Sequence, residues 1–200
     1  QRQMCIRDSY ATDALAAAAT IVGDLGHTAS ERDPDFRGAE NAVMALYTRG
    51  VRQHVEQVPH PERLDARTRG FGRLGRLVPD RMLRAALRDR DHHAARANQV
   101  FDHIDVLLTP VTGTQPVPVG TWAGKGAVRT LLGMGRVYPF TAIWNYLGNP
   151  AAAIPVGSDA DGLPLSVMAV APPHREDVLL ALAQQIEDAT EWPTHRPPLA

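Results

Sequence analysis

The stretch PFTAIWNYLGNPAAAIPVGSDADGLPLSVMAVA, residues 139–171, decides the fold of this chain. Residues 151–156 and 163–171 are apolar runs, and the loop between them is polar with a glycine at each end. Short apolar runs separated by such a loop predict a strand, a loop and a second strand. Residues 167–170 are apolar at every position, so we expect the second strand to lie in the interior with both faces covered.

The neighbouring segments supply the layers that such strands need. Asn145, Gly148 and Pro150 indicate a turn before the first strand. Residues 105–110, DVLLTP, indicate a further strand. After the second strand, Glu176 opens a predicted helix, because negative side chains are favourable at a helix N-terminus. The apolar side of that helix consists of Leu179, Leu182, Ala183 and Ile186.

The first half of the chain predicts helices. Apolar residues recur at helical spacing over residues 12–25 and 39–58, and residues 79–104 form the clearest pattern, which we interpret as one helix. The recurring apolar residues of the second segment are Met44, Tyr47, Val51, Val55 and Val58. A loop rich in Thr, Pro, Val and Gly follows residue 110, and long loops of this kind are often functional.

The sequence GFGRLG at residues 70–75 formally matches the dinucleotide-binding pattern G-x-G-x-x-G. That site requires a strand before the glycines and a helix N-terminus after them, where unpaired N–H groups meet the pyrophosphate. Residues 62–69 are instead polar and highly charged. The glycines therefore do not indicate a nucleotide site, and we interpret residues 67–76 as a flexible arginine-glycine connection.

The C-terminal part of the chain resembles that of the amidase signature family, whose members are serine hydrolases that cleave carboxamides. The residues that carry the resemblance are Asn145, Gly148, Pro150, Ala151, Pro155, Gly157, Gly162, Leu163, Pro164, Glu176, Leu179, Leu180 and Glu187. The resemblance implies an α/β class and a partial amidase-signature fold, in which a mixed β-sheet is flanked by helices. It also implies hydrolysis of a carboxamide to a carboxylate and ammonia through a serine acyl-enzyme, without a cofactor.

The reactive residues of the family have no counterpart in this sequence. Members use two serines in a glycine-rich loop and a lysine base. Here no two of Ser9, Ser30, Ser158 and Ser166 are adjacent, and the one lysine, Lys125, lies late in the chain. We therefore assign no catalytic residue, and we expect the C-terminal part of an amidase that is inactive alone.

The domain organisation follows from the same resemblance. The peptide MCIRD at residues 4–8 is what one reading frame of a transposon end used in sequencing libraries encodes, so residues 1–9 are interpreted as an adapter artefact. Residues 10–200 are expected to form part of a single amidase domain. Within it, the proline-rich residues 190–200 are expected to form a surface tail.

The resemblance also implies that Thr141 and Trp144, with Phe140 beside them, face the substrate. Aromatic rings there add apolar contact area, which favours hydrophobic or aryl amides. Packing in the core is the alternative for Trp144 and Phe140, and the sequence leaves both interpretations open. Asn145 is expected to hold the turn through backbone hydrogen bonds. We expect specificity to be determined between Thr109 and Trp144.

Composition excludes several classes of protein. The chain has 44% hydrophobic and 22% charged residues, which is typical of a globular fold, and its net charge of -1 offers no field for nucleic acid or a membrane surface. The longest apolar run, residues 15–22, is too short to span a bilayer. A single cysteine gives no disulfide framework, so a cytoplasmic location is expected. No histidine or cysteine pattern has metal-ligand spacing, and we predict no metal.

Two alternative functions remain open. A glutamyl-tRNA amidotransferase A-type subunit shares the implied fold and would associate with other subunits and RNA, against which the near-neutral charge argues. A noncatalytic binding module would have to fold alone while exposing strand edges and an apolar face. The expected partners are a small-molecule amide substrate and, for the full-length parent, a second copy in a homodimer.

Overall fold

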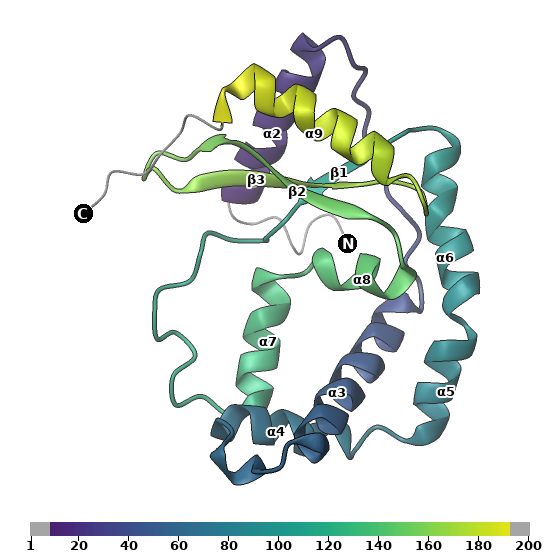
Figure 1. Ribbon diagram of the computed structural model, residues 1–200, viewed down its shortest axis with the longest axis vertical. Helices are drawn as coiled ribbons and strands as arrows, with labels where there is room; N and C mark the ends of the chain where they lie inside the picture. The colour runs from purple at the N-terminus through teal and green to yellow at the C-terminus, as the bar shows by residue number, and fades with distance from the viewer. Residues whose placement is uncertain (1–8, 193–200) are drawn as a thin grey trace.

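The computed structural model describes residues 9–192, which form an α/β structure with helices on both sides of a sheet (Figure 1). The three-stranded sheet consists of β1 (Leu107–Pro110), β2 (Ala151–Ser158) and β3 (Pro164–Val170), with β3 in the middle. Every residue of β3 from Val167 to its end is buried. The predicted strand, loop and interior strand are therefore confirmed, together with the α/β class.

Both pairs of strands in this sheet are antiparallel. Met168 of β3 lies opposite Thr109 of β1 and Ala153 of β2. The short loop between β2 and β3 joins neighbouring strands, and a connection of that length fits only antiparallel neighbours. The mixed pairing expected from the resemblance is therefore not seen among the strands that the structure describes. The register of β2 shifts between Pro155 and Gly157, where the proline has no N–H to donate to the ladder.

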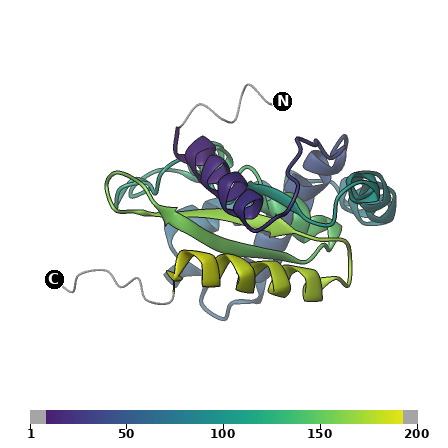
Figure 2. The ribbon, with the colours of Figure 1, turned by 90° about the horizontal axis from the view of Figure 1, so that it is seen from above.

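Two helices, α2 (Ser9–Asp24) and α9 (Glu176–Thr190), cover one face of the sheet side by side (Figure 2). Both match predicted helices. The buried side of α9 includes Leu179, Leu182 and Ile186, as the periodicity predicts. The core between these helices and the sheet contains small residues from α2 and larger ones from the strands, namely Ala14, Ala18, Val22, Ile154, Val156, Leu165, Val167 and Ala169.

The other face of the sheet packs against α8 (Thr141–Leu147) and, beyond it, α3 (Ala39–Gln57), α5 (Asp80–Arg88) and α6 (Arg90–Asn98). The turn predicted around Asn145 is in fact this short helix, which ends at Gly148. The second core joins the sheet to these helices through Leu107, Met168, Val170, Ile143, Trp144, Tyr146, Leu147, Ala39, Ala42, Ala86 and Ala97.

The single helix expected over residues 79–104 is wrong, because the chain breaks at Asp89 and again where η2 (Gln99–Asp102) begins. Asp89 ends α5 and precedes α6, with φ −89° and ψ 1°. The carbonyl of Ala86 accepts a hydrogen bond of 2.7 Å from the Tyr146 hydroxyl. A side chain inserted at that carbonyl is a common cause of a helix break.

The flexible connection expected at residues 67–76 is also wrong, because these residues form most of α4 (Ala66–Gly75), which follows η1 (Pro61–Arg63). The glycines allow close helix packing. A Cβ at Gly72 would lie 3.3 Å from Val55 of α3, and a Cβ at Gly70 would lie 2.9 Å from that of Ala127. Ala127 opens α7 (Ala127–Val137), so the glycines let α4 lie against two helices at once.

The recurring apolar residues of α3 are not the residues that the helix buries. Its buried positions are Ala39, Ala42, Ala45 and Thr48. Met44 and Tyr47 are 46% and 41% exposed. Among the described residues, no helix is long and apolar enough to cross a membrane. Most of the predicted adapter peptide and of the predicted surface tail lies outside residues 9–192.

Candidate functional site

The three predicted substrate contacts lie at the start of α8, but at different depths. Phe140 precedes the helix and Thr141 is its first residue, and both are half-buried. Trp144 lies one turn further on, with 2% of its surface exposed. Its ring meets that of Phe36 edge-on at 5.2 Å between centroids and that of Phe101 at 6.4 Å. Phe140 and Thr141 therefore carry the accessible surface here, while Trp144 joins α8 to the core.

The loop after β1 lies against the turn that precedes α8. The N–H of Gly113 donates to the carbonyl of Val137 at 2.9 Å, at the end of α7. A Cβ at Gly113 would lie 2.6 Å from the Arg136 carbonyl and 3.2 Å from the ring of Pro139. Glycine is needed at this close approach, which brings the loop after β1 next to Pro139, the residue before Phe140.

Trp122 fixes the same loop to the middle of α7. Its ring lies directly over Gly133, where a Cβ would overlap it. The Lys125 ammonium lies 5.5 Å from the centroid of that ring, and the Arg67 guanidinium donates to the Trp122 carbonyl at 3.2 Å. Gln115 adds a further contact by donating to Asp159 at 2.9 Å. Residues 111–126 are therefore held from α4, α7 and the β2–β3 loop.

The asparagine that secures the end of α8 is Asn149, not the predicted Asn145. Asn145 is exposed, whereas Asn149 is 9% exposed. The Asn149 amide donates to Asn98 of α6 at 2.7 Å and to the Ala171 carbonyl at 2.9 Å. Gly148, with φ 84°, reverses the chain and turns Asn149 inward. The sequence pattern that could have indicated Asn149 is the Gly-Asn-Pro run at residues 148–150, directly before β2.

Tyr146 connects α8 to the break between α5 and α6. Besides its bond to Ala86, its hydroxyl lies 2.9 Å from Nδ1 of His93. The Arg90 guanidinium donates to the Tyr146 carbonyl at 2.6 Å, near the C-terminus of α8, where a positive charge is favourable. Burial raises the pKa of the Tyr146 hydroxyl above its ordinary value of 10.0, and the charge of Asp89 raises it further.

Raising the pH above about 10 is expected to destabilise the fold, because Tyr146 has a higher pKa when folded than when unfolded. Its stabilising contribution is complete below the unfolded pKa and is lost as the pH rises through the folded pKa. Burial and Asp159 likewise raise the pKa of Tyr10. Urea denaturation at several alkaline pH values measures the slope, which should be shallower in Tyr146→Phe. Identical slopes in the two proteins contradict this account.

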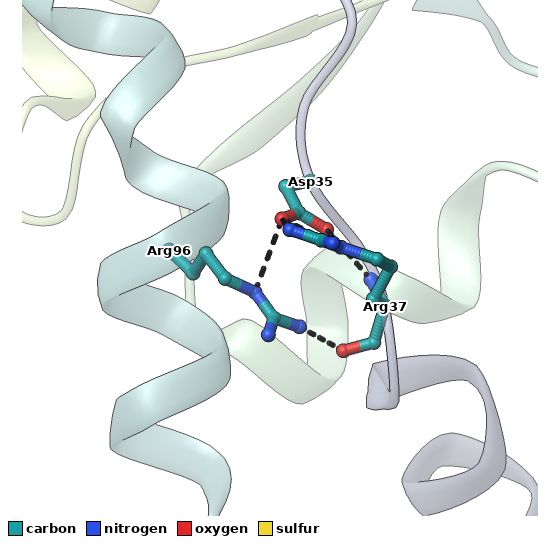
Figure 3. Close-up of polar contacts among 3 residues, drawn as sticks. All are labelled: Asp35, Arg37 and Arg96. Atoms are coloured by element: carbon teal, nitrogen blue, oxygen red, sulfur yellow. Dashed lines mark hydrogen bonds and ion pairs between the residues drawn. The ribbon is translucent and has the colours of Figure 1, made fainter.

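A polar cluster ties the segment between α2 and α3 to α6 (Figure 3). The Arg37 side chain donates to both oxygens of Asp35, at 2.9 and 3.0 Å from Nε. These hydrogen bonds, with the nearby Arg96 charge, hold the pKa of the Asp35 carboxyl well below its usual range. Nε of Arg96 lies 3.4 Å from Asp35, and Arg96 also donates to the Arg37 carbonyl. The cluster positions Phe36 against Trp144.

The serines do not form a reactive group in the part of the chain that the structure describes. Ser9, Ser30 and Ser158 are exposed, and they lie at the start of α2, in the segment after α2 and at the end of β2, while Ser166 is half-buried within β3. Lys125 lies over an aromatic ring. Within residues 9–192, no three His, Cys, Asp or Glu side chains are grouped so that they could hold a metal ion.

Comparison with known proteins identifies the fold and the family. Residues 8–180 match the family described as Amidase. The chain is 40% identical over 185 residues to "Putative amidase AmiB2" of Mycobacterium tuberculosis (strain ATCC 25618 / H37Rv), covering 92% of this chain and 40% of that protein. It is 26% identical over 210 residues to the 6-aminohexanoate-cyclic-dimer hydrolase of Pseudomonas sp. (strain NK87), covering 96% and 43%.

Comparison with solved structures shows the same fold in two enzymes. A 6-aminohexanoate cyclic dimer hydrolase complexed with substrate superposes with a TM-score of 0.76 at 22% identity, over 93% of this chain and 42% of that chain. A bacterial aryl acylamidase of the amidase signature family superposes with a TM-score of 0.69 at 19% identity, over 97% and 44%.

The solved structures show that this molecule has the amidase-signature fold. More particularly, the chain belongs to the amidase family, in its amidase signature form. It spans about 40% of the length of these curated relatives.

Proposed function

We propose that this chain forms part of an amidase that hydrolyses a linear carboxamide to a carboxylate and ammonia. The match to the amidase family over residues 8–180 carries the proposal. In the proposed reaction a serine hydroxyl attacks the amide carbon, and the proton that the hydroxyl loses is transferred to the leaving nitrogen, which departs as ammonia. Water then hydrolyses the acyl-enzyme and releases the acid. N–H donors aimed at the developing oxyanion stabilise both tetrahedral intermediates.

In this proposal the 200 residues contribute part of the substrate pocket and not the nucleophile. Phe140 and Thr141 contact the substrate from the start of α8, and Trp144, proposed with them from the sequence, holds that helix in place from the core. The anchored loop at residues 111–126 lies beside them. The enzyme works on a small amide without a cofactor, in a bacterial cytoplasm. Support comes from the half-buried surfaces of Phe140 and Thr141 and from the bacterial sources of the relatives.

Ammonia release from a panel of aliphatic and aryl amides tests the proposal. The 200-residue chain is assayed beside a longer protein, in which the genomic reading frame is extended upstream of residue 10. We expect only the extended product to release ammonia, and we expect mass spectrometry to detect an acyl group on one of its serines. Ammonia release by the 200-residue chain contradicts the assignment of the nucleophile outside it. No release by either protein contradicts the amidase activity.

A further inference from the structure

Helix α3 has two apolar faces, of which one packs into the core beneath the sheet and the other lies toward α4. Its small residues, including Ala42 and Ala45, are buried. The larger residues Tyr47, Val51 and Val55 lie on another side of the helix and keep accessible surface. Packing against α4 leaves this second face incompletely buried, although larger apolar side chains gain more from burial than alanines do.

This second face forms one wall of an open groove of about 390 Å³. The other wall comes from Leu64 and Thr68, where the chain runs from η1 into α4. The Tyr47 ring is held edge-on against Phe71 of α4, with 6.1 Å between centroids, so both walls belong to packed helices. The volume lies within the range of small-molecule sites, which is about 300–1,000 Å³.

The lining of the groove selects an uncharged occupant. No Asp, Glu, Lys or Arg is among the residues that line it, and its polar groups are limited to Tyr47, His54 and Thr68. An ionised group placed there would lose hydration without gaining a counter-charge. The three polar side chains offer a few hydrogen-bonding positions at the edge of an otherwise aliphatic surface.

Gly50 keeps the groove open. It lies in the middle of α3 among the lining residues, and a Cβ built there meets no atom within 4 Å. The glycines of α4 differ, since a Cβ at Gly72 would lie 3.3 Å from Val55. Packing therefore does not require glycine at position 50, although glycine costs a helix interior about 1 kcal/mol relative to alanine. Its effect in this structure is to leave space on the groove side.

We propose that this groove binds the aryl or branched-alkyl part of an uncharged amide. That the ligand is an amide rests on the proposed function, whereas its apolar and uncharged character follows from the residues that line the groove. A small molecule fits better than a second copy of the chain. The groove is lined by nine residues, while a stable protein interface uses about 20–30 residues on each side.

Gly50→Leu tests this site, because it adds a large side chain among the lining residues at a position where a Cβ meets no atom within 4 Å. The matched control is Gly23→Leu, at a helical glycine of α2 that also has no atom within 4 Å of a Cβ. The 200-residue chain and both variants are titrated with 4-phenylbutyramide, 4-phenylbutyrate and acetamide, and binding is followed by backbone amide NMR shifts. Thermal unfolding of each variant reports its folding.

We expect 4-phenylbutyramide to shift the signals of Gly50, Val51 and Thr68, and to bind at least about tenfold more weakly to Gly50→Leu because its apolar group loses the space that it fills. Gly23→Leu should bind like the parent, and 4-phenylbutyrate and acetamide should bind weakly to all three proteins. Unchanged binding in a folded Gly50→Leu variant overturns the proposal. Self-association that Gly50→Leu abolishes, without ligand binding to the parent, overturns it in favour of a second copy. Binding requires no serine, so this result is separate from ammonia release.

Discussion

Gly75→Ala is expected to destabilise the fold by roughly 2–3 kcal/mol, although glycine to alanine stabilises most helix interiors. The new Cβ would overlap the Thr48 carbonyl oxygen of α3 and lie 2.7 Å from Cβ of Arg52. These atoms are fixed by the backbone of α3, so α4 would have to move away as a unit. Because natural domains are stable by only about 5–15 kcal/mol, such a loss is large. Urea denaturation followed by far-UV circular dichroism measures it.

Gly50→Ala is the matched control, because Gly50 lies on the partner helix α3 and a Cβ there meets nothing within 4 Å. We expect this variant to gain about 1 kcal/mol from helix propensity alone. The two alanine variants should therefore move the urea midpoint in opposite directions. A shift of the same sign and size in both would show that close approach of α4 to α3 does not determine the effect.

The parts of the fold that the sequence predicts well are those with local signals. Residues 151–171 combine two apolar runs with a glycine-bounded loop, and both strands are observed there. The helix α9 begins at its acidic residues, as its N-terminal charges predict. The pairing direction depends on which strands lie side by side, and the resemblance supplied a mixed sheet where the described strands pair antiparallel.

The parts that the sequence predicts badly depend on contacts between distant segments. Gly70, Gly72 and Gly75 indicate flexibility when only neighbours in sequence are considered, yet each faces another helix at close range. The helix expected over residues 79–104 breaks where Tyr146, distant in sequence, bonds to Ala86. Periodicity in the sequence cannot reveal either contact, because tertiary packing overrides local propensity in both places.

At the candidate site, too, the sequence predicts what is local and misses what depends on contacts between distant segments. The sequence places Phe140, Thr141 and Trp144 together, and the structure has them at the N-terminal end of α8. It does not reveal their depth, which is set by rings from residues 36 and 101 packing on Trp144. Asn149 was missed because its partners, Asn98 and Ala171, come from other elements.

Trp144→Ala is expected to destabilise the fold by about 3–5 kcal/mol, as truncation of a fully buried aromatic residue does. The ring is 2% exposed and packs between Phe36 and Phe101, so its removal leaves a cavity between α8 and its neighbours. Urea denaturation measures the loss. Phe140→Ala, at the half-buried position before α8, is the control, and it should lose less because part of its ring already contacts water.

Comparison of these two variants separates packing from substrate contact at Trp144. If the indole serves only a ligand, its removal leaves the free energy of unfolding close to that of the parent chain, and Trp144→Phe does the same. If it holds α8 in the core, Trp144→Phe restores much of the stability that alanine loses, because a phenyl ring refills most of the cavity. We expect the second result, because the edge-on contact with Phe36 remains possible for a smaller ring. Loss of α8 packing then also disturbs Phe140 and Thr141, so Trp144 affects the proposed substrate surface through position and not through contact.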